Sequence, residues 1–348
     1  MSPPTRAASD SDIQSYLRRV HHPLAHDVAA LKSDVGQEPL RVLRELMIGH
    51  NLFIPFENTF MHCVGTVTSP PLDPASIHSR LVDRHLGGYC YFHGLGISQI
   101  LLGLGYSCRP VSAYVREGPS SSDASDSVIL PERPTHCCVL LDLEDTTYLI
   151  DCGFARRGPV TPVALPKTGN PGEAGPIVGS PVLPSETWRI TVADLSKLAL
   201  PKESERRLIN PTYILNHRST GKGQTTDNAS WDMLYAITTR TEELEAYEEL
   251  SWHVCIGNKG VTHKFREYFA VARTYQPGAT GPEYPDESND ILPVDFSARL
   301  ARLSLTNMEL STFENGEKEV LCTFKDEEER LRGLRKWFGL CGPFEGKL

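Results

Sequence analysis

The chain has 348 residues, of which 40% are hydrophobic and 23% are charged, and its formal net charge is −9. This length favours two or three structural units around at least one sizeable core, and the composition is that of a globular protein. The acidic balance, without a dense Lys/Arg stripe, argues against a nucleic-acid-binding protein and against binding to anionic membrane surfaces.

The N-terminal segment and the cysteines indicate a cytoplasmic protein. The segment MSPPTRAASDSD lacks the apolar core of a signal peptide, and no later run reaches the roughly 18 apolar residues of a membrane-spanning helix. The nine cysteines are an odd number without a C-x-x-C spacing, which fits neither a secreted disulfide framework nor a compact zinc site. We therefore expect a cytoplasmic location, no membrane association and no bound metal.

The first hundred residues are predicted to be mainly helical. Apolar residues recur there at three- and four-residue spacing, and Asp73-Pro74 has the form of a helix cap followed by a first-turn proline. After Gly87-Gly88, a helix is expected to begin at Cys90 and to end at the glycines that follow residue 102. The predicted helices are 12–20, 38–48, 75–84 and 90–104.

From residue 108 the pattern changes to short β-prone runs separated by surface loops, and the last third mixes helices and strands. The predicted strands are 110–115, 136–143, 148–151, 188–192, 232–237, 268–273 and 319–324, the predicted loops are 118–127, 161–184 and 276–289, and the later predicted helices are 241–249 and 327–338.

A thiol at the first turn of a helix is the strongest chemical signal. Cys90 follows two glycines, so its thiolate would face the partial positive charge and the unpaired N–H groups of the helix N-terminus. A buried, inert thiol at a helix start is the alternative, since most cysteines are of that kind. A nucleophilic role requires a base nearby.

His136 and Asp151 can supply that base. They flank a predicted hairpin whose turn is Glu144-Asp145-Thr146, and their separation of 15 residues is odd. In an antiparallel pair joined by an even-numbered loop, such residues project from the same face. The predicted triad has Cys90 as nucleophile, His136 as base and later acid, and Asp151 as the carboxylate that fixes the imidazole tautomer. If each residue is considered alone, His136 could be a strand-end histidine bonded to a backbone carbonyl, and Asp151 could be an ordinary turn aspartate.

Four short motifs occur in one order along the chain. They are Ile54-Pro55-Phe56-Glu57-Asn58, Gly87-Gly88-Tyr89-Cys90, His136, and Asp151-Cys152-Gly153-Phe154. In this order and with this His-to-Asp spacing, they resemble the signature of arylamine N-acetyltransferases of the fungal-like or bacterial-like kind. The resemblance spans most of the chain and continues weakly through 247–265.

The resemblance implies an α+β fold with the Cys-His-Asp core that cysteine proteases also have. A helical domain over 1–106 would carry the Cys, a β-barrel domain over 107–238 the His and Asp, and 239–348 would form an α/β lid. It implies ping-pong transfer of an acetyl or other short acyl group from acyl-CoA, through an acyl-cysteine, to the nitrogen of an arylamine, arylhydrazine or arylhydroxylamine. Acetyl-CoA is the expected co-substrate, with no metal or redox cofactor. Whether the donor is acetyl-, propionyl- or malonyl-CoA, the natural acceptor and the oligomeric state stay open.

Further site residues follow from the same resemblance. Phe154 and Phe56 are expected to contact the aromatic substrate, and an ordinary core phenylalanine is the alternative for Phe154. Gly260, Thr262 and Lys264 fall where the family's CoA-contacting loop lies, and a plain surface turn is the alternative there.

Three positions depart from the family pattern. Leu86 stands where the family commonly has Arg before Gly-Gly, and Phe92 and Gly94 stand where it often has Glu or Gln and then Asn. We expect those polar side chains to brace the site, so their loss bears on orientation and rate more than on the identity of the nucleophile.

Other classes of protein are compatible with the sequence. The order Cys, His, Asp also suits papain-like proteases and transglutaminases, which would not consume a CoA thioester. The three departures keep open a catalytically weakened homologue that serves as a scaffold. A zinc-binding module is the third alternative, but its candidate ligands have the wrong spacing for known compact fingers; they are His62, Cys63, Cys90, His93, His136, Cys137 and Cys138.

Overall fold

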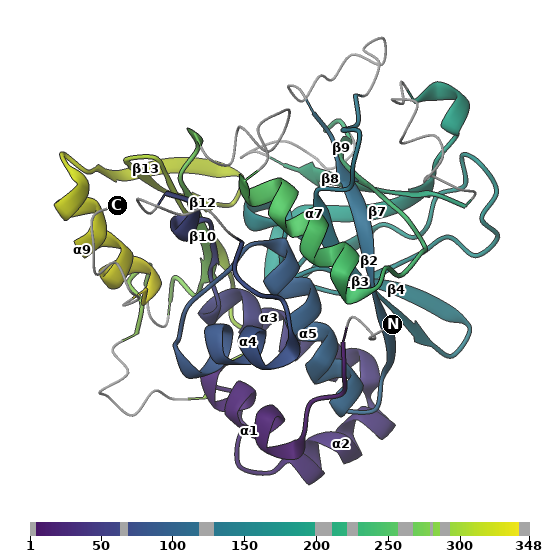
Figure 1. The fold of residues 1–348 in the computed structure, drawn as a ribbon, viewed down its shortest axis with the longest axis horizontal. Helices are drawn as coiled ribbons and strands as arrows, with labels where there is room; N and C mark the ends of the chain where they lie inside the picture. The colour runs from purple at the N-terminus through teal and green to yellow at the C-terminus, as the bar shows by residue number, and fades with distance from the viewer. Residues whose placement is uncertain are drawn as a thin grey trace.

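The computed structural model describes residues 5–62, 69–117, 129–198, 211–220, 229–256, 267–278, 281–285 and 293–340. The helices of the N-terminal third lie in the lower part of Figure 1, a curled sheet lies above them to the right, and a second sheet with the C-terminal helix lies to the left. None of the described helices is both long and apolar enough to cross a membrane.

The N-terminal third is helical because its apolar residues fall on one side of each helix and meet in a common core. The first helix begins with a capping box, in which Ser9 Oγ accepts from the Asp12 N–H and Asp12 accepts from the Ser9 N–H. The helices are α1 (Asp10–Arg19), α2 (Val28–Gln37), α3 (Pro39–Phe53), α4 (Pro74–His78) and α5 (Cys90–Gly103), with the 3-10 turn η1 (Thr59–His62) and the π-helical turn η2 (Ser79–Asp83).

The middle of the chain forms an eight-stranded antiparallel sheet. Its inner face shares one hydrophobic core with the N-terminal helices, so Leu101, Val139 and Trp188 are all fully buried in the same cluster. The elements are β2 (Ser107–Val115), β3 (His136–Leu143), β4 (Thr146–Ile150), β5 (Val163–Ala164), β6 (Val178–Ser180), β7 (Leu183–Val192), β8 (Tyr213–Ser219) and β9 (Asp232–Ile237), with the 3-10 turns η3 (Ala155–Arg157) and η4 (Leu195–Lys197).

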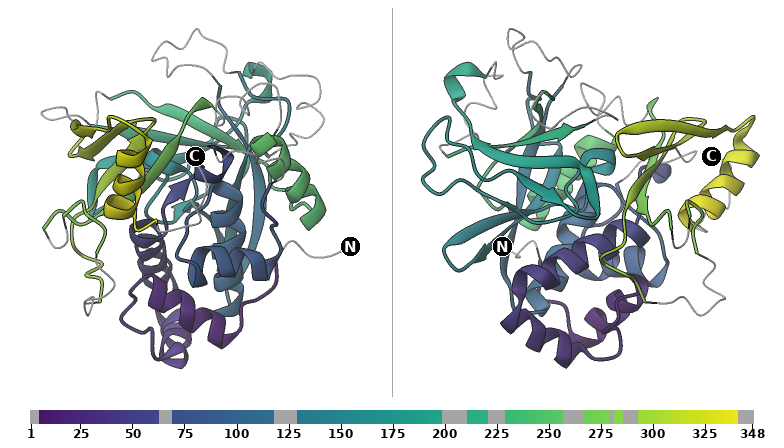
Figure 2. Two further views of the ribbon diagram at one scale, coloured as in Figure 1. Left: turned by 60° about the vertical axis from the view of Figure 1, so that its left-hand side comes forward. Right: turned by 180° about the vertical axis from the view of Figure 1, so that it is seen from behind.

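The strand order closes this sheet into a nearly complete barrel. The order is β5-β4-β3-β2-β9-β8-β7-β6, and β5 at one edge contacts β7 near the other. Helix α5 packs against β2 and β3, as Figure 2 allows the reader to follow from two sides. The start of α5 therefore lies beside the strand that begins at His136.

A second, five-stranded antiparallel sheet combines the C-terminal third with a short strand from the helical region. In the order β1-β10-β11-β12-β13, the first strand pairs Phe56 with Ala272 and Glu57 with Val271. Leu334 and Phe338 of the last helix pack on this sheet in a second core. The strands of this sheet are β1 (Phe56–Glu57), β10 (Ala270–Tyr275), β11 (Ala301–Thr306), β12 (Glu309–Glu314) and β13 (Glu317–Thr323), and the last helix is α9 (Glu327–Phe338). Helix α7 (Leu244–Ile256) precedes β10 and packs in the first core.

The predicted α+β class, with helices first, a barrel second and a mixed C-terminal part, is confirmed. The predicted loop 161–184 is wrong in part, because β5, β6 and the start of β7 lie in it, and strands this short carry too few residues for a recognisable alternation. The helix predicted at 241–249 is displaced to Leu244–Ile256, and α2, β8, β11 and β12 had no prediction.

The predicted loop 118–127 lies outside the described residues, as does part of 276–289. One hydrophobic core runs from α1 through the barrel to α7, so it does not mark a boundary at 106 or at 238. The domain boundaries at these two residues stay a prediction.

Candidate active site

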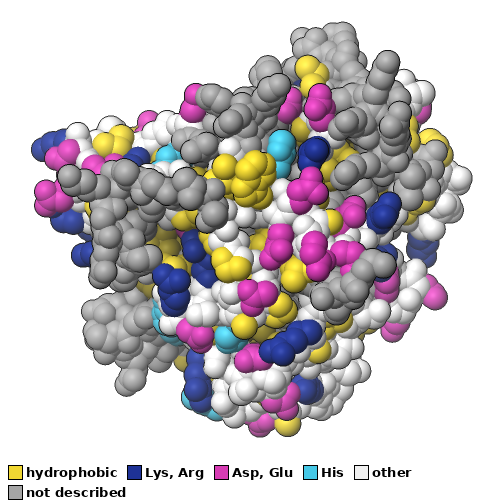
Figure 3. All heavy atoms as spheres, viewed as in Figure 1, with side chains coloured by type: hydrophobic (Ala, Val, Ile, Leu, Met, Phe, Trp, Pro, Cys, Tyr) yellow, Lys and Arg dark blue, Asp and Glu magenta, His cyan; other side chains and the backbone are white. Residues whose placement is uncertain are grey.

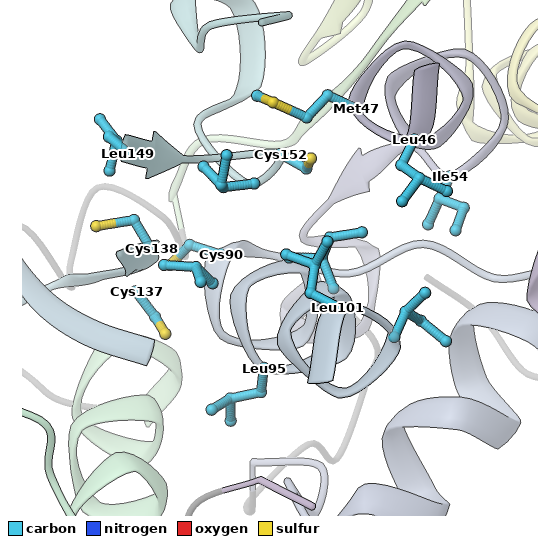
Figure 4. Packing of buried hydrophobic residues seen from close by; sticks show 14 of the residues in the cluster. Leu46, Met47, Ile54, Cys90, Leu95, Leu101, Cys137, Cys138, Leu149 and Cys152 are labelled. Atoms are coloured by element: carbon cyan, nitrogen blue, oxygen red, sulfur yellow. The ribbon is translucent and has the colours of Figure 1, made fainter. Parts of the chain in front are cut away.

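Cys90 is the first residue of α5, and the preceding Tyr89 gives the helix no side-chain cap. The first N–H groups of a helix have no intrahelical partner, so they favour a negative charge at the Cys90 sulfur. The residue is 6% exposed, and its Sγ lies 3.6 Å from the carbonyl oxygen of Thr135. Figure 4 shows Cys90 at this helix start, beside Cys137 and Cys138 of β3.

The hairpin of β3 and β4 brings His136 and Asp151 together as the odd spacing predicts. Val139 pairs with Ile150, which places Asp151 diagonally from His136 on the same face. The His136 Nε2 to Asp151 Oδ2 distance is 2.9 Å. Because this bond engages Nε2, the Nδ1 atom is the ring nitrogen left for the Cys90 thiol.

Asp151 accepts two more hydrogen bonds, neither of which was predicted from the sequence. The Tyr235 hydroxyl donates to Oδ2 at 2.5 Å, and the Gly153 N–H donates to Oδ1 at 2.9 Å. Tyr235 comes from β9, which is 84 residues away in sequence, and no local pattern connects it to Asp151. These donors fix the carboxylate that orients the imidazole.

The buried charges of the pair stabilise each other. Burial by itself lowers the pKa of His136, but the Asp151 carboxylate outweighs it and, with a contribution from Cys90, raises this pKa to about 10. Burial raises the pKa of Asp151, yet His136, Tyr235 and Gly153 together bring it below its ordinary value of 3.8. At neutral pH the geometry therefore favours an ionised carboxylate and a protonated imidazole, to which a thiolate is the complementary group.

A cavity of about 540 Å³ opens onto this group, with Cys90 and His136 in its wall. The predicted substrate contacts Phe56 and Phe154 both line it. The Phe154 ring meets the His136 ring edge-on, with centroids 5.2 Å apart. A cavity of this size with aromatic walls suits a small, flat organic molecule.

A second polar cluster, which sequence reasoning did not find, lines the same cavity. Glu186 of β7 accepts from Arg302 of β11 in a bidentate pair at 2.7 and 2.8 Å, and lies 3.0 Å from His217 Nε2 of β8. All three residues are buried. They join the barrel to the second sheet, and no sequence motif marks them because each comes from a different strand.

Gly260, Thr262 and Lys264 lie outside the described residues. Within the described ranges, no three His, Cys, Asp or Glu side chains are grouped so as to hold a metal ion. The described cysteines are all free thiols.

The chain is similar in sequence to known acyltransferases. Residues 39–177 match a family model described as N-acetyltransferase. The arylamine N-acetyltransferase of Mycobacterium tuberculosis is 30% identical over 154 residues, which are 44% of this chain and 49% of that protein, so the chain spans about half the length of these relatives. The N-malonyltransferase FDB2 of Fusarium pseudograminearum is 25% identical over 344 residues, covering 95% of this chain and 88% of that protein.

A solved structure extends the likeness over the whole fold. The arylamine N-acetyltransferase of Mycobacterium marinum in complex with CoA matches with a TM-score of 0.61 at 21% identity, covering 94% of this chain and 92% of that chain. At this level of identity the likeness shows that the two chains share a fold.

Proposed function

We propose that this chain, a relative of the arylamine N-acetyltransferases in sequence and in fold, transfers an acyl group from acyl-CoA to an arylamine through Cys90. The observation that carries the proposal is the hydrogen-bonded His136–Asp151 pair beside a thiol at a helix N-terminus, in the wall of an aromatic-lined cavity. The CoA complex of the mycobacterial neighbour supports acyl-CoA as the co-substrate.

In the first half-reaction, the Cys90 thiolate attacks the carbonyl carbon of the acyl-CoA thioester. A new C–S bond forms, the CoA thiolate leaves, and it takes the proton that the His136 imidazolium holds. Asp151 keeps its negative charge throughout and stabilises the imidazolium. Exchanging one thioester for another changes the total bond energy little. The acyl-cysteine therefore keeps the reactivity of a thioester toward an amine.

In the second half-reaction, the amine nitrogen attacks the acyl-cysteine carbonyl. A C–N bond forms, the Cys90 thiolate leaves, and His136, neutral after the first step, accepts the amine proton. Phe154 and Phe56 offer apolar faces on which an aryl ring can stack. Gly260, Thr262 and Lys264 remain the predicted contacts of CoA.

Acetyl is the acyl group that we propose first, in line with the mycobacterial relatives' names. Malonyl is the second candidate, because the similarity to N-malonyltransferase FDB2 covers 95% of the chain. We also propose a cytoplasmic location, where acyl-CoA is available.

Intact mass spectrometry of the protein mixed separately with acetyl-, propionyl- and malonyl-CoA tests this function. We expect a mass gain of one acyl group with the true donor, no gain in the Cys90→Ala variant, and loss of the added mass when an arylamine is supplied. His136→Gln is expected to lower the acylation rate by about 100-fold or more, because the proton relay is lost.

No adduct with any of the three donors would contradict the proposal. In that case, cleavage of a peptide library would favour the cysteine hydrolase, and absence of both activities would favour the catalytically silent homologue.

A further inference from the structure

The turn that leads into Cys90 is held by two side chains, the buried His93 and the partly buried Arg80. Arg80 Nε donates to the Gly87 carbonyl oxygen at 2.7 Å, and His93 Nε2 lies 2.9 Å from the Gly88 carbonyl oxygen. Arg80 comes from η2 and His93 from the first turn of α5. We refer to these two residues as the Gly-Gly clamp.

Arg80 is itself fixed from several directions. Its Nη2 pairs with Glu57, whose side chain is 1% exposed, and the Glu57 carboxylate also accepts the Thr59 N–H at 2.7 Å. The guanidinium lies 5.0 Å above the Phe92 ring and 5.6 Å above the Phe60 ring. Phe92 is one of the three residues that differ from the family pattern, and here its ring packs against the Arg80 guanidinium. A cation over the face of an aromatic ring is a favourable contact.

His93 ends a chain of hydrogen bonds whose directions can be deduced. A carbonyl oxygen only accepts, so His93 Nε2 carries the hydrogen and its Nδ1 accepts from His50 Nε2 at 2.7 Å. His50 Nδ1 then accepts from the Tyr16 hydroxyl at 3.1 Å. This assignment satisfies every polar atom with both rings neutral, and burial favours the same state because it lowers the pKa of His93 to about 4 and that of His50 well below its ordinary value.

The backbone around the clamp is packed too closely to move freely. The Glu57 N–H donates to the Gly88 carbonyl oxygen at 2.8 Å, and the Gly88 N–H donates to the Pro55 carbonyl oxygen at 3.3 Å. A Cβ atom at Gly87 would lie 2.0 Å from that same Pro55 oxygen, so only glycine fits. The two carbonyl groups that the clamp binds therefore lie in a turn with little free space around its backbone.

We infer that Arg80 and His93 are positioning residues that hold the Gly87-Gly88 turn so that the Cys90 thiol stays at the N-terminus of α5. Arg80 thereby supplies, from η2, a guanidinium beside the turn at a place where the preceding residue is the buried Leu86. The inference rests on the proposed function only for the role of Cys90 as the nucleophile. The contacts of Arg80 and His93 are independent of any substrate.

The reactivity of Cys90 toward iodoacetamide as a function of pH tests the clamp without acyl-CoA. The titratable groups around the thiol must stay intact in such a test. They are His136, Cys137 and Cys138 of β3, Asp151, Tyr235 of β9, Cys255 of α7, and Tyr89 and Tyr91 beside the thiol.

We expect His93→Leu and Arg80→Met to move the midpoint of the alkylation profile upward by about one pH unit, which is about tenfold slower alkylation at pH values well below the wild-type midpoint. The milder variants His93→Gln and Arg80→Lys keep a donor and are expected to fall between these variants and the wild type. They also serve as the measured pair if the first two do not fold. Ser98→Ala is the matched control, because the hydroxyl of this buried serine of α5 donates within its own helix, to the Leu95 carbonyl oxygen at 2.7 Å.

Folded clamp variants with the wild-type alkylation profile would overturn the inference, as would an equal shift in Ser98→Ala. Failure of the proposed function looks different. It would appear as absence of any acyl adduct on the wild type, while the alkylation profiles of the variants still report on the clamp.

Discussion

His136 and Asp151 carry opposite charges in the fold, and their effects on stability have opposite dependence on pH. The pKa of His136 is raised from 6.5 to about 10, so its stabilising contribution is complete below about pH 6.5 and is lost as the pH rises through 10. The pKa of Asp151 is lowered from 3.8, so its contribution is present above that pH and is lost as the pH falls through the folded value.

We predict that His136→Gln lowers the free energy of unfolding by about 1 to 3 kcal/mol at pH 6, because Asp151 loses its buried partner, and that the difference from wild type shrinks toward pH 10. Urea unfolding at several pH values measures it. The exposed His26, changed to Gln, is the control, and its variant should follow the wild type at every pH. A difference that grows between pH 7 and 10 would show that the pair is not charged in the fold.

At the scale of elements, the packing of α5 on β3 explains one departure from the family pattern. A Cβ atom at Gly94 would lie 2.8 Å from Cys137 Sγ and 2.9 Å from the Cys137 carbonyl oxygen. The helix and the strand therefore touch here, and an asparagine does not fit. This contact also sets the distance between the helix that begins with Cys90 and the strand that begins with His136.

We predict that Gly94→Ala lowers the free energy of unfolding by about 1 to 3 kcal/mol and slows acylation of Cys90, because β3 has to move away. Gly96→Ala on the same helix is the control. Its Cβ would meet only the side-chain tips of Leu81 and Ile77, at 2.9 and 3.2 Å, which can shift. Denaturant unfolding and the acylation rate compare the two variants, and equal effects would contradict the prediction.

At the scale of the whole molecule, Arg302 and Glu186 join the second sheet to the barrel across the cavity. Their exposed fractions are 3% and 8%, and removing Arg302 leaves the buried Glu186 carboxylate without its guanidinium partner, with His217 as the remaining contact. We predict that Arg302→Met lowers the free energy of unfolding by about 3 to 5 kcal/mol and that adding Glu186→Gln restores part of it. Urea unfolding measures both variants. A double variant no more stable than the single one would show that the charge pair is not the source of the loss.

An exposed ion pair on α9 provides the control for Arg302→Met. Arg332 pairs with Glu328 at 2.5 Å on α9, but both side chains are largely exposed, at 63% and 81%. Arg332→Met should therefore change the free energy of unfolding by less than about 1 kcal/mol. Charged side chains of both signs are intermixed on the face shown in Figure 3, where exposed pairs of this kind contribute little.

The sequence by itself determined the elements whose signal is local. The helix that begins at Cys90, the strands His136–Leu143 and Asp232–Ile237 and the helix Glu327–Phe338 were all predicted with the bounds observed or nearly so. The spacing of His136 and Asp151 also sufficed to place them on one face, although the turn has two residues, Glu144 and Asp145, and the predicted turn residue Thr146 already pairs with Leu143.

Only the tertiary structure decided the partners that complete the site. Tyr235 lies 84 residues from Asp151, Glu186 lies 116 residues from Arg302, and Arg80 reaches Glu57 across 23 residues and two other elements. Periodicity reports which side of its own element a residue occupies, whereas a contact between distant segments depends on how the elements pack. For that reason the departures at Leu86, Phe92 and Gly94 could be noticed in the sequence, but the guanidinium beside the turn and the contact with Cys137 became visible only in the folded chain.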